Sequence, residues 1–179
     1  MRVLGVDPGS GITGWGVVEE CERDLRYIAS GVVRVRGDRA ERLATIYEAL
    51  SEICAQLRSA AVVIEQTFVG DNIQTAFRLG EVRGAVMVAA ARAKIPVVEY
   101  SPAQIKVAVS GYGRAAKEQM QLMVGRLLRL DRELAVDEAD ALAAAICHLH
   151  AHRLAFLTGA TVGRAYRSRR RGLGGSAPP

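Results

Sequence analysis

The first sixteen residues, MRVLGVDPGSGITGWG, constrain the fold of this chain more than any other stretch. An apolar run ends at Asp7, and a turn rich in proline and glycine then leads into a second apolar run. This pattern predicts a buried strand with Asp7 at its carboxyl edge, where the turn leaves the sheet. Such edges hold the reactive groups of α/β folds. Asp7 is therefore a candidate catalytic residue, although an aspartate before proline and glycine also serves to cap a tight turn.

Hydrophobic periodicity predicts an alternating arrangement of strands and helices along the chain. We expect strands at residues 3–6, 15–19, 25–35, 61–64 and 96–100, and helices at residues 39–57, 72–93, 116–130 and 137–156, with a further helix starting at Ser101 and Pro102. Short links between the first three strands favour an antiparallel meander. The helix at 39–57 is a crossover, which makes the next strand parallel to a neighbour. The expected fold class is α/β, with a five-stranded mixed sheet flanked by helices.

The helical segment at residues 72–93 has more apolar surface than one contact with the sheet would bury. Small residues such as Gly80 and Gly84 also permit close approach of another element. This excess predicts a second buried surface, either a dimer contact or an enclosed position in the core. We take Val86 and Ala89 as candidate residues of the dimer contact.

Composition predicts one cytoplasmic domain with no structural disulfides. Of the 179 residues, 50% are hydrophobic and 24% are charged, which is enough to bury a core without covalent support. The cysteines, Cys21, Cys54 and Cys147, have no paired spacing, as expected for free thiols in a reducing compartment. We recognise neither a signal peptide nor a membrane-spanning apolar run, so we expect no contact with membranes.

The formal net charge of +5 favours a polyanionic partner such as nucleic acid. Part of this charge lies in an arginine-rich stretch close to the C-terminal sequence GLGGSAPP, whose composition is typical of disordered chain. We therefore expect residues 1–158 to form the folded domain and residues 159–179 to form a basic, disordered tail.

Acidic residues are placed where several of them could meet. Glu65 follows the strand at 61–64, so Asp7 and Glu65 emerge at the same edge if their strands are parallel neighbours. Asp137 and Asp140, spaced i, i+3, share one face at the start of the last helix. Carboxylates at one point repel each other unless cations intervene, and four of them would offset two Mg²⁺ ions, as in two-metal phosphodiester hydrolysis. Acids in a first helical turn also complement the helix dipole, so Asp137 and Glu138 alone are not diagnostic.

The motifs GVDPGSGITGWGVV, VVIEQTFVGDN, LGEVRGA and DEADALAAAI resemble those of the RuvC family of Holliday junction resolvases. The resemblance runs in order from residue 1 to about residue 150. It implies a ribonuclease H-like fold, a homodimer, and dependence on Mg²⁺, or on Mn²⁺ in its place. It also implies paired symmetric nicks in a four-way DNA junction during recombination and DNA repair, and association with the RuvA and RuvB branch-migration proteins.

By position, the family's metal-binding acids fall on Asp7, Glu65, Asp137 and Asp140. Glu138 departs from the small or neutral residue expected between the last two acids. This departure leaves open whether Asp137 or Glu138 reaches the metal, although helical phase favours Asp137 alongside Asp140.

Four further residues are candidates for contact with DNA. The family's junction-stacking aromatic falls on Phe68, and two lysines near its active site fall on Lys106 and Lys117. We expect Lys117 to contribute to catalysis as well. Arg114, in a glycine-flanked loop, is the fourth candidate. An ordinary loop aromatic and solvated surface charges are the alternative interpretations.

The run His148, His150 and His152 has a spacing that could chelate a metal, but histidines near a helix carboxyl end more often complement the helix dipole at the surface. We expect surface histidines here.

Three other functions compete with a resolvase. A kinase of the actin and sugar-kinase type needs a second similar domain, and a four-acid exonuclease needs an acid where this chain has Gly9. A non-catalytic basic DNA-binding subunit would explain the charge but not an acid at the end of the strand at 61–64. Another ribonuclease H-like nuclease also stays open.

Overall fold

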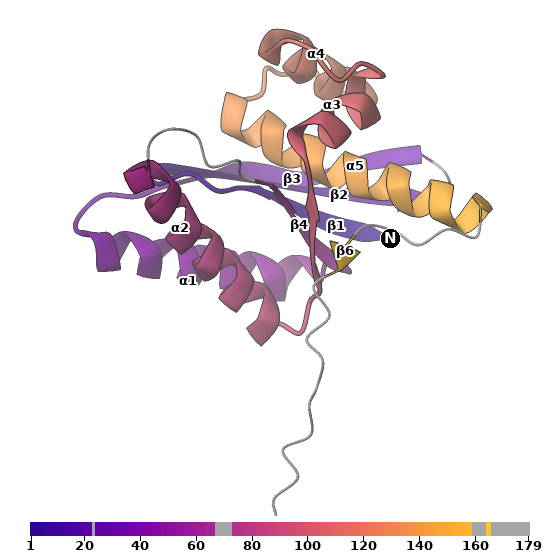
Figure 1. Cartoon of the computed structure of the whole chain (residues 1–179). Helices are drawn as coiled ribbons and strands as arrows, with labels where there is room; N and C mark the ends of the chain where they lie inside the picture. Colours follow the sequence, from indigo (N-terminus) through magenta and orange to yellow (C-terminus); the bar gives the residue numbers. More distant parts are fainter. Residues whose placement is uncertain (23, 67–72, 159–163, 166–179) are drawn as a thin grey trace, which may run out of the picture.

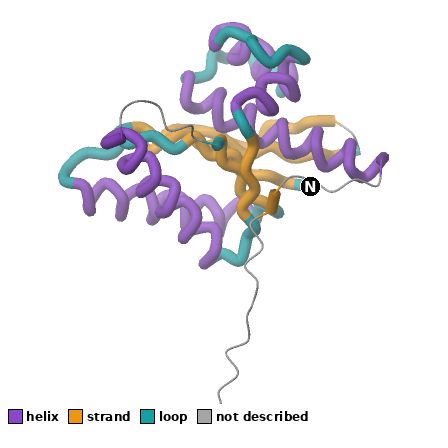
Figure 2. Tube along the Cα trace, viewed as in Figure 1, coloured by secondary structure: helices purple, strands orange, loops and turns teal. Residues whose placement is uncertain are grey.

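A mixed β-sheet forms the centre of the computed structural model, which describes residues 1–22, 24–66, 73–158 and 164–165 (Figures 1 and 2). Its strand order is β3-β2-β1-β4-β5-β6. The strands are β1 (Arg2–Asp7), β2 (Ile12–Cys21), β3 (Asp24–Arg34), β4 (Ala61–Glu65), β5 (Val97–Tyr100) and β6 (Arg164–Ala165). The helices are α1 (Arg39–Leu57), α2 (Ile73–Arg92), α3 (Pro102–Ser110), α4 (Lys117–Leu127) and α5 (Val136–Thr158).

Strand pairing agrees with the predicted meander and crossover. β1 pairs antiparallel with β2 and β2 with β3, whereas β1, β4 and β5 run parallel to one another. The five expected strands are all present. The short β6 pairs antiparallel with β5 and lies within the 159–179 segment that we expected to be a tail. The rest of that segment lies outside the described residues.

Helices cover both faces of the sheet (Figure 1). α1 and α2 pack on one face, where Leu4 and Val6 of β1 are buried. α5 packs on the other face, against Val3 of β1 and Val63 of β4, and α3 and α4 lie outside α5. Successive residues of a strand point to opposite faces. Asp7 and Glu65, two residues after Gly5 and Val63, therefore point toward the α5 layer.

Glycines in β1 and β2 let α5 lie directly on the sheet. A Cβ at Gly5 would lie 1.9 Å from the Ala141 carbonyl oxygen, and a Cβ at Gly14 would lie 1.9 Å from that of Asp137. The absence of side chains at these positions brings the first turns of α5 close to the carboxyl end of β1.

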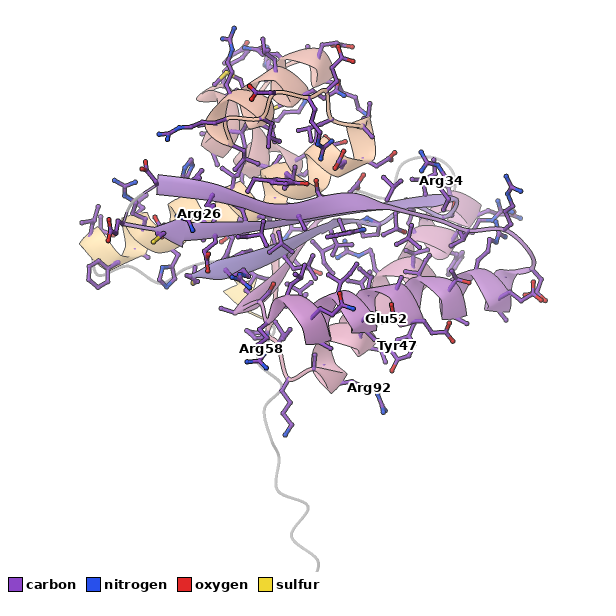
Figure 3. All side chains as sticks on the ribbon, turned by 180° about the vertical axis from the view of Figure 1, so that it is seen from behind. Arg26, Arg34, Tyr47, Glu52, Arg58 and Arg92 are labelled. Carbon is purple, nitrogen blue, oxygen red and sulfur yellow. The ribbon has the colours of Figure 1, made fainter. Side chains whose placement is uncertain are left out.

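The outer strand β3 carries charge at both ends. In the view from behind, Arg26 and Arg34 lie near the two ends of this edge strand (Figure 3), and both side chains are exposed. Charged residues on an edge strand oppose pairing with a further strand.

Ser101 caps α3 as expected. Its side chain accepts a hydrogen bond from the Gln104 backbone, and Pro102 occupies the first helical position. No helix among the described residues is both long and apolar enough to traverse a bilayer.

The predicted contact residues of α2 are wrong. Val86 and Ala89 are each only 1% exposed, because they lie on the stripe that faces the α1 layer and the sheet. The exposed face of α2 instead carries Phe77 and Val88, which are 68% and 52% exposed. A Cβ at Gly84, between them, would meet nothing within 4 Å. The surplus apolar surface is real, but it lies on the opposite side from the one that we expected.

Candidate active site

A cavity of about 470 Å³ opens at the carboxyl ends of β1 and β4. Its lining brings together five of the residues proposed from the sequence: Asp7, Glu65, Lys106, Lys117 and Asp140. The remaining lining residues are Pro8, Gln66, Leu79, Pro102, Ile105 and Met120. The cavity therefore lies at the edge of the sheet where the sequence places its chemistry.

Each acid is placed at this edge of the sheet by the element that carries it; Asp7, Glu65 and Asp140 line the cavity, and Asp137 does not. Asp7 ends β1 and Glu65 ends the adjacent parallel strand β4, so both leave the sheet at the same edge. Asp137 and Asp140 lie in the first turns of α5, which rests on the glycines of β1 and β2. Residues up to 133 positions apart in sequence, Asp7 and Asp140, are thereby brought to one cavity.

Burial and the repulsion of neighbouring acids raise the pKa values of Asp7, Glu65 and Asp140. The pKa of Asp7 rises to about 7, mainly because the carboxyl is buried, and also because Asp140, Glu65 and Asp137 lie nearby. Burial followed by the charge of Asp140 raises the pKa of Glu65, and burial raises the pKa of Asp140 despite the opposing charge of Lys117. The acids thus share one electrostatic environment.

The donor chemistry of the cavity suits a hard divalent cation, because carboxylate oxygens are the ligands that Mg²⁺ prefers. The pKa of Asp7 is raised partly because the neighbouring acids repel its negative charge, and a bound cation would offset this repulsion. Within the described parts of the chain, no three His, Cys, Asp or Glu side chains are grouped closely enough to hold a metal ion as they stand. The acids therefore fit a cation by type and charge, and metal binding stays a prediction.

Glu138 belongs to a different environment from its neighbour Asp137. Both of its oxygens accept hydrogen bonds from Arg132, at 2.6 and 3.1 Å, and this pairing lowers the pKa of Glu138. Neither Asp137 nor Glu138 is among the residues that line the cavity, but the charge of Asp137 acts on Asp7. The structure thus favours Asp137 as the acid that acts with Asp140.

Arg83 of α2 is a residue near the site that sequence reasoning missed. Its Nη1 donates to the backbone carbonyl of Glu65 at 2.6 Å, and its Nη2 donates to Glu99 Oε1 at 2.5 Å. The guanidinium therefore ties α2 to the end of β4 that carries Glu65. Arg83 lies in the LGEVRGA motif, which marked the position but gave no role for it.

The candidates for DNA contact are distributed unevenly. Lys106 of α3 and Lys117 at the start of α4 line the cavity. Arg114 is exposed in the loop between these helices and does not line it. Phe68 lies outside the described residues.

The expectation of surface histidines is wrong for His148. It is 6% exposed, and its Nδ1 shares a hydrogen bond of 3.0 Å with the Tyr100 hydroxyl. Burial, together with the charge of His152, lowers the pKa of His148 to about 4. His150 is half-buried beside the Ala108 carbonyl, and only His152 is exposed. The prediction failed because α5 is enclosed on nearly every side as far as residue 149.

Comparison with known proteins identifies the family. The chain matches the family model described as crossover junction endodeoxyribonuclease RuvC over residues 3–148. The chain belongs to the RuvC family. It is 53% identical over 150 residues to the crossover junction endodeoxyribonuclease RuvC of Alkalilimnicola ehrlichii, which covers 83% of this chain and 91% of that protein.

Solved RuvC structures share the fold of this family member. Thermus thermophilus RuvC superposes with a TM-score of 0.82 at 33% identity, covering 92% of this chain and 99% of that one. T. thermophilus RuvC in complex with Holliday junction substrate gives a TM-score of 0.78 at 34% identity, covering 86% and 96%. The predicted ribonuclease H-like fold and RuvC membership are confirmed. RuvC proteins are endodeoxyribonucleases, so the kinase and the non-catalytic subunit are excluded as functions.

Proposed function

We propose that this chain resolves four-way DNA junctions by metal-dependent hydrolysis at the cavity formed by β1, β4 and α5. One observation carries the proposal. Acids from two parallel strand ends and a helix start converge there, and their proximity helps raise the pKa of Asp7 to about 7. An acidic cluster is a poor place for a DNA phosphate unless divalent ions intervene, so the convergence points to a metal-dependent reaction on a polyanion.

Four acids are the proposed ligands of the metal: Asp7, Glu65, Asp137 and Asp140. We assign Mg²⁺ to them, with Mn²⁺ as a substitute and two ions per active site. When bound, the ions supply an activated water and stabilise the leaving oxygen. The acids themselves fix where the scissile phosphate lies, because they hold oxygen ligands on rigid strand ends and on a helix that rests on the sheet.

The lysines of the cavity act on the phosphate in this proposal. Lys117 opposes the rise in pKa of Asp7, Glu65 and Asp140, so its charge is felt throughout the acidic cluster. An ammonium at this place stabilises negative charge that develops on the phosphate during cleavage. Lys106, which also lines the cavity, contacts the DNA backbone in this proposal.

The wider DNA surface extends beyond the cavity. We assign junction contacts to Arg114 and, by family position, base stacking to Phe68. Residues 1–158 are the nuclease domain in this proposal, and the basic segment 159–179 is a tail apart from β6, which pairs with β5. The remaining assignments rest on family membership: a cytoplasmic role in recombination and repair with RuvA and RuvB as partners.

Resolution of a junction into two duplexes takes two matched cuts, which a symmetric dimer supplies. The exposed face of α2, with Phe77 and Val88 on either side of Gly84, is the proposed dimer surface. Light scattering should give a mass near twice the 19.2 kDa chain. Val88→Asp should shift the protein toward monomer and uncouple the two cuts. A wild-type monomer that cuts both strands in concert would contradict the arrangement.

A nicking assay tests the proposed function. Synthetic four-way junctions and linear duplexes of the same sequence are incubated with the full chain, with and without Mg²⁺. We expect paired nicks in the junction alone and only with the metal. Equal cutting of the linear duplex would contradict the structure selectivity, and cutting in excess chelator would contradict the metal requirement.

A further inference from the structure

We propose that Glu138 is a positioning residue, which Arg132 and Ser30 clamp so that α5 presents Asp137 and Asp140 to the cavity. The inference rests on the proposed function, because it concerns the geometry of the metal ligands. It extends that function by assigning a role to a charge cluster, with a buried carboxylate at its centre, on the far side of the helix from the acids.

Every lone pair of the Glu138 carboxylate faces a donor. Oε1 accepts from the Ser30 hydroxyl and from Arg132 Nη2, and Oε2 accepts from Arg132 Nη1 and from the Ala135 backbone N–H at 3.2 Å. The Glu138 side chain is only 8% exposed. A carboxylate this deeply buried is stable only while its partners stay in place.

The partners of Glu138 belong to other elements than α5. Ser30 lies on β3, and Arg132 lies in the connection that precedes α5. Arg132 Nη2 also donates to the Tyr27 hydroxyl and to Ser30 Oγ, each at 3.1 Å, and the guanidinium lies over the Tyr27 ring, 5.7 Å from its centroid. The cluster therefore fastens the first turn of α5 to the outer strand of the sheet.

This attachment acts with the packing of Leu142 and Ile146, both 0% exposed, to fix how the first turn of α5 is rotated about the helix axis. Each helical residue advances by about 100°, so Glu138 points away from the side that Asp137 and Asp140 share. The glycines of β1 and β2 set how close the helix lies but present no side chain that would stop it turning. With Glu138 held toward β3, the two aspartates are directed toward Asp7.

Arg132→Met separates positioning from a simple effect of charge. The change removes a positive charge from the neighbourhood of the acids, so charge alone leaves Mn²⁺ binding unchanged or makes it tighter. Loss of positioning makes Mn²⁺ binding weaker. We expect the dissociation constant for Mn²⁺, measured by electron paramagnetic resonance on the full chain without DNA, to rise about tenfold or more.

Arg129→Met is the matched control, because Arg129 lies in the same connection, its side chain is 82% exposed, and its one ion pair among the described residues is a 3.9 Å contact to Asp24. We expect its Mn²⁺ affinity to equal that of the wild type.

Ser30→Ala is the milder variant in case Arg132→Met fails to fold. Loss of one hydrogen bond to Glu138 should raise the dissociation constant about threefold. Junction nicking by Arg132→Met and by Ser30→Ala should recover at high metal concentration.

The inference is overturned if folded Arg132→Met binds Mn²⁺ as tightly as the wild type or more tightly. If Arg132→Met does not fold, unchanged Mn²⁺ binding by Ser30→Ala overturns it. Asp7→Asn, measured in parallel, distinguishes this failure from failure of the proposed function. If Asp7→Asn weakens Mn²⁺ binding but the clamp variants do not, only the positioning role is lost. If Asp7→Asn has no effect, the proposed metal site is wrong, and the clamp has no ligands to position.

Discussion

Two carboxylates that are neighbours in sequence, Asp137 and Glu138, lie in opposite electrical environments. Asp137 is one of four acids whose like charges act on each other, and it contributes to raising the pKa of Asp7. Glu138 is paired with Arg132 and donors from the backbone and β3, so its pKa is lowered. The difference separates two uses of a buried acid: a compensated carboxylate holds the fold together, whereas crowded carboxylates store charge for a cation.

The largest effect is expected from removing a charge on the crowded side. Asp7→Asn keeps the shape of the side chain but removes one proposed ligand, so cleavage should fall by roughly a thousandfold, about 4 kcal/mol of transition-state stabilisation. Junction binding in a gel-shift assay should persist. Asp140→Asn should behave in the same way. Normal nicking by Asp140→Asn would show that α5 supplies no essential metal ligand, and Asp137 and Glu138 would then not differ in function as described.

Lys117→Ala tests the role of the lysine ammonium group within the acidic cluster. Cleavage should slow by about a hundredfold because the ammonium no longer stabilises the phosphate charge. Binding should weaken much less. Single-turnover rates and binding constants over a range of salt concentrations separate the two effects. A loss confined to affinity, with a flatter salt dependence, would instead make Lys117 an ordinary backbone contact.

On the compensated side, the expected effect is on stability. Glu138→Gln leaves Arg132 without its buried partner, so the free energy of unfolding in urea should fall by about 2 to 3 kcal/mol. Asp7→Asn should not lower it, because it removes a repelled charge. The two variants should therefore move unfolding in opposite directions. An equal loss of stability in both would show that the two environments do not differ as described.

A further expected effect is on the pH dependence of metal-free protein. Asp7 has a pKa of about 7 in the folded chain against 3.8 for an ordinary aspartate. As the pH rises, the Asp7 carboxyl therefore loses its proton in the unfolded chain before it does so in the folded chain. Protonated Asp7 thus stabilises the fold fully below about pH 4, and this stabilisation is lost as the pH rises through 7. Melting temperatures in chelator should fall over this range, and less steeply in Asp7→Asn. A wild-type curve no steeper than that of the variant would contradict the shift.

The positions of the acids at the edge of the sheet could be predicted because local sequence patterns determine them. A buried strand that ends on an acid, followed by a proline and glycine turn, places Asp7 whatever the rest of the chain does. Glu65 follows from the parallel crossover, and the i, i+3 spacing places Asp137 and Asp140 on one face of α5.

Features that depend on how helices rotate and pack could not be predicted. Periodicity shows that α2 has a buried stripe and surplus apolar surface, but not which side faces the sheet, so Val86 was assigned to the wrong side. His148 was misplaced because residues of the helix end are normally exposed, whereas here His148 is buried and hydrogen-bonded to Tyr100 of β5. The clamp on Glu138 joins residues 108 positions apart, and no sequence spacing signals such a contact.

The most direct test of the account locates the metal itself. Crystals of the full chain soaked in Mn²⁺ give anomalous scattering that marks each bound ion. We expect peaks within the cavity, ligated by carboxylate oxygens of Asp7, Glu65, Asp137 and Asp140, while Glu138 stays paired with Arg132 and has no peak beside it. A peak at Glu138, or an empty cavity with Mn²⁺ bound elsewhere, would contradict the division between crowded and compensated acids.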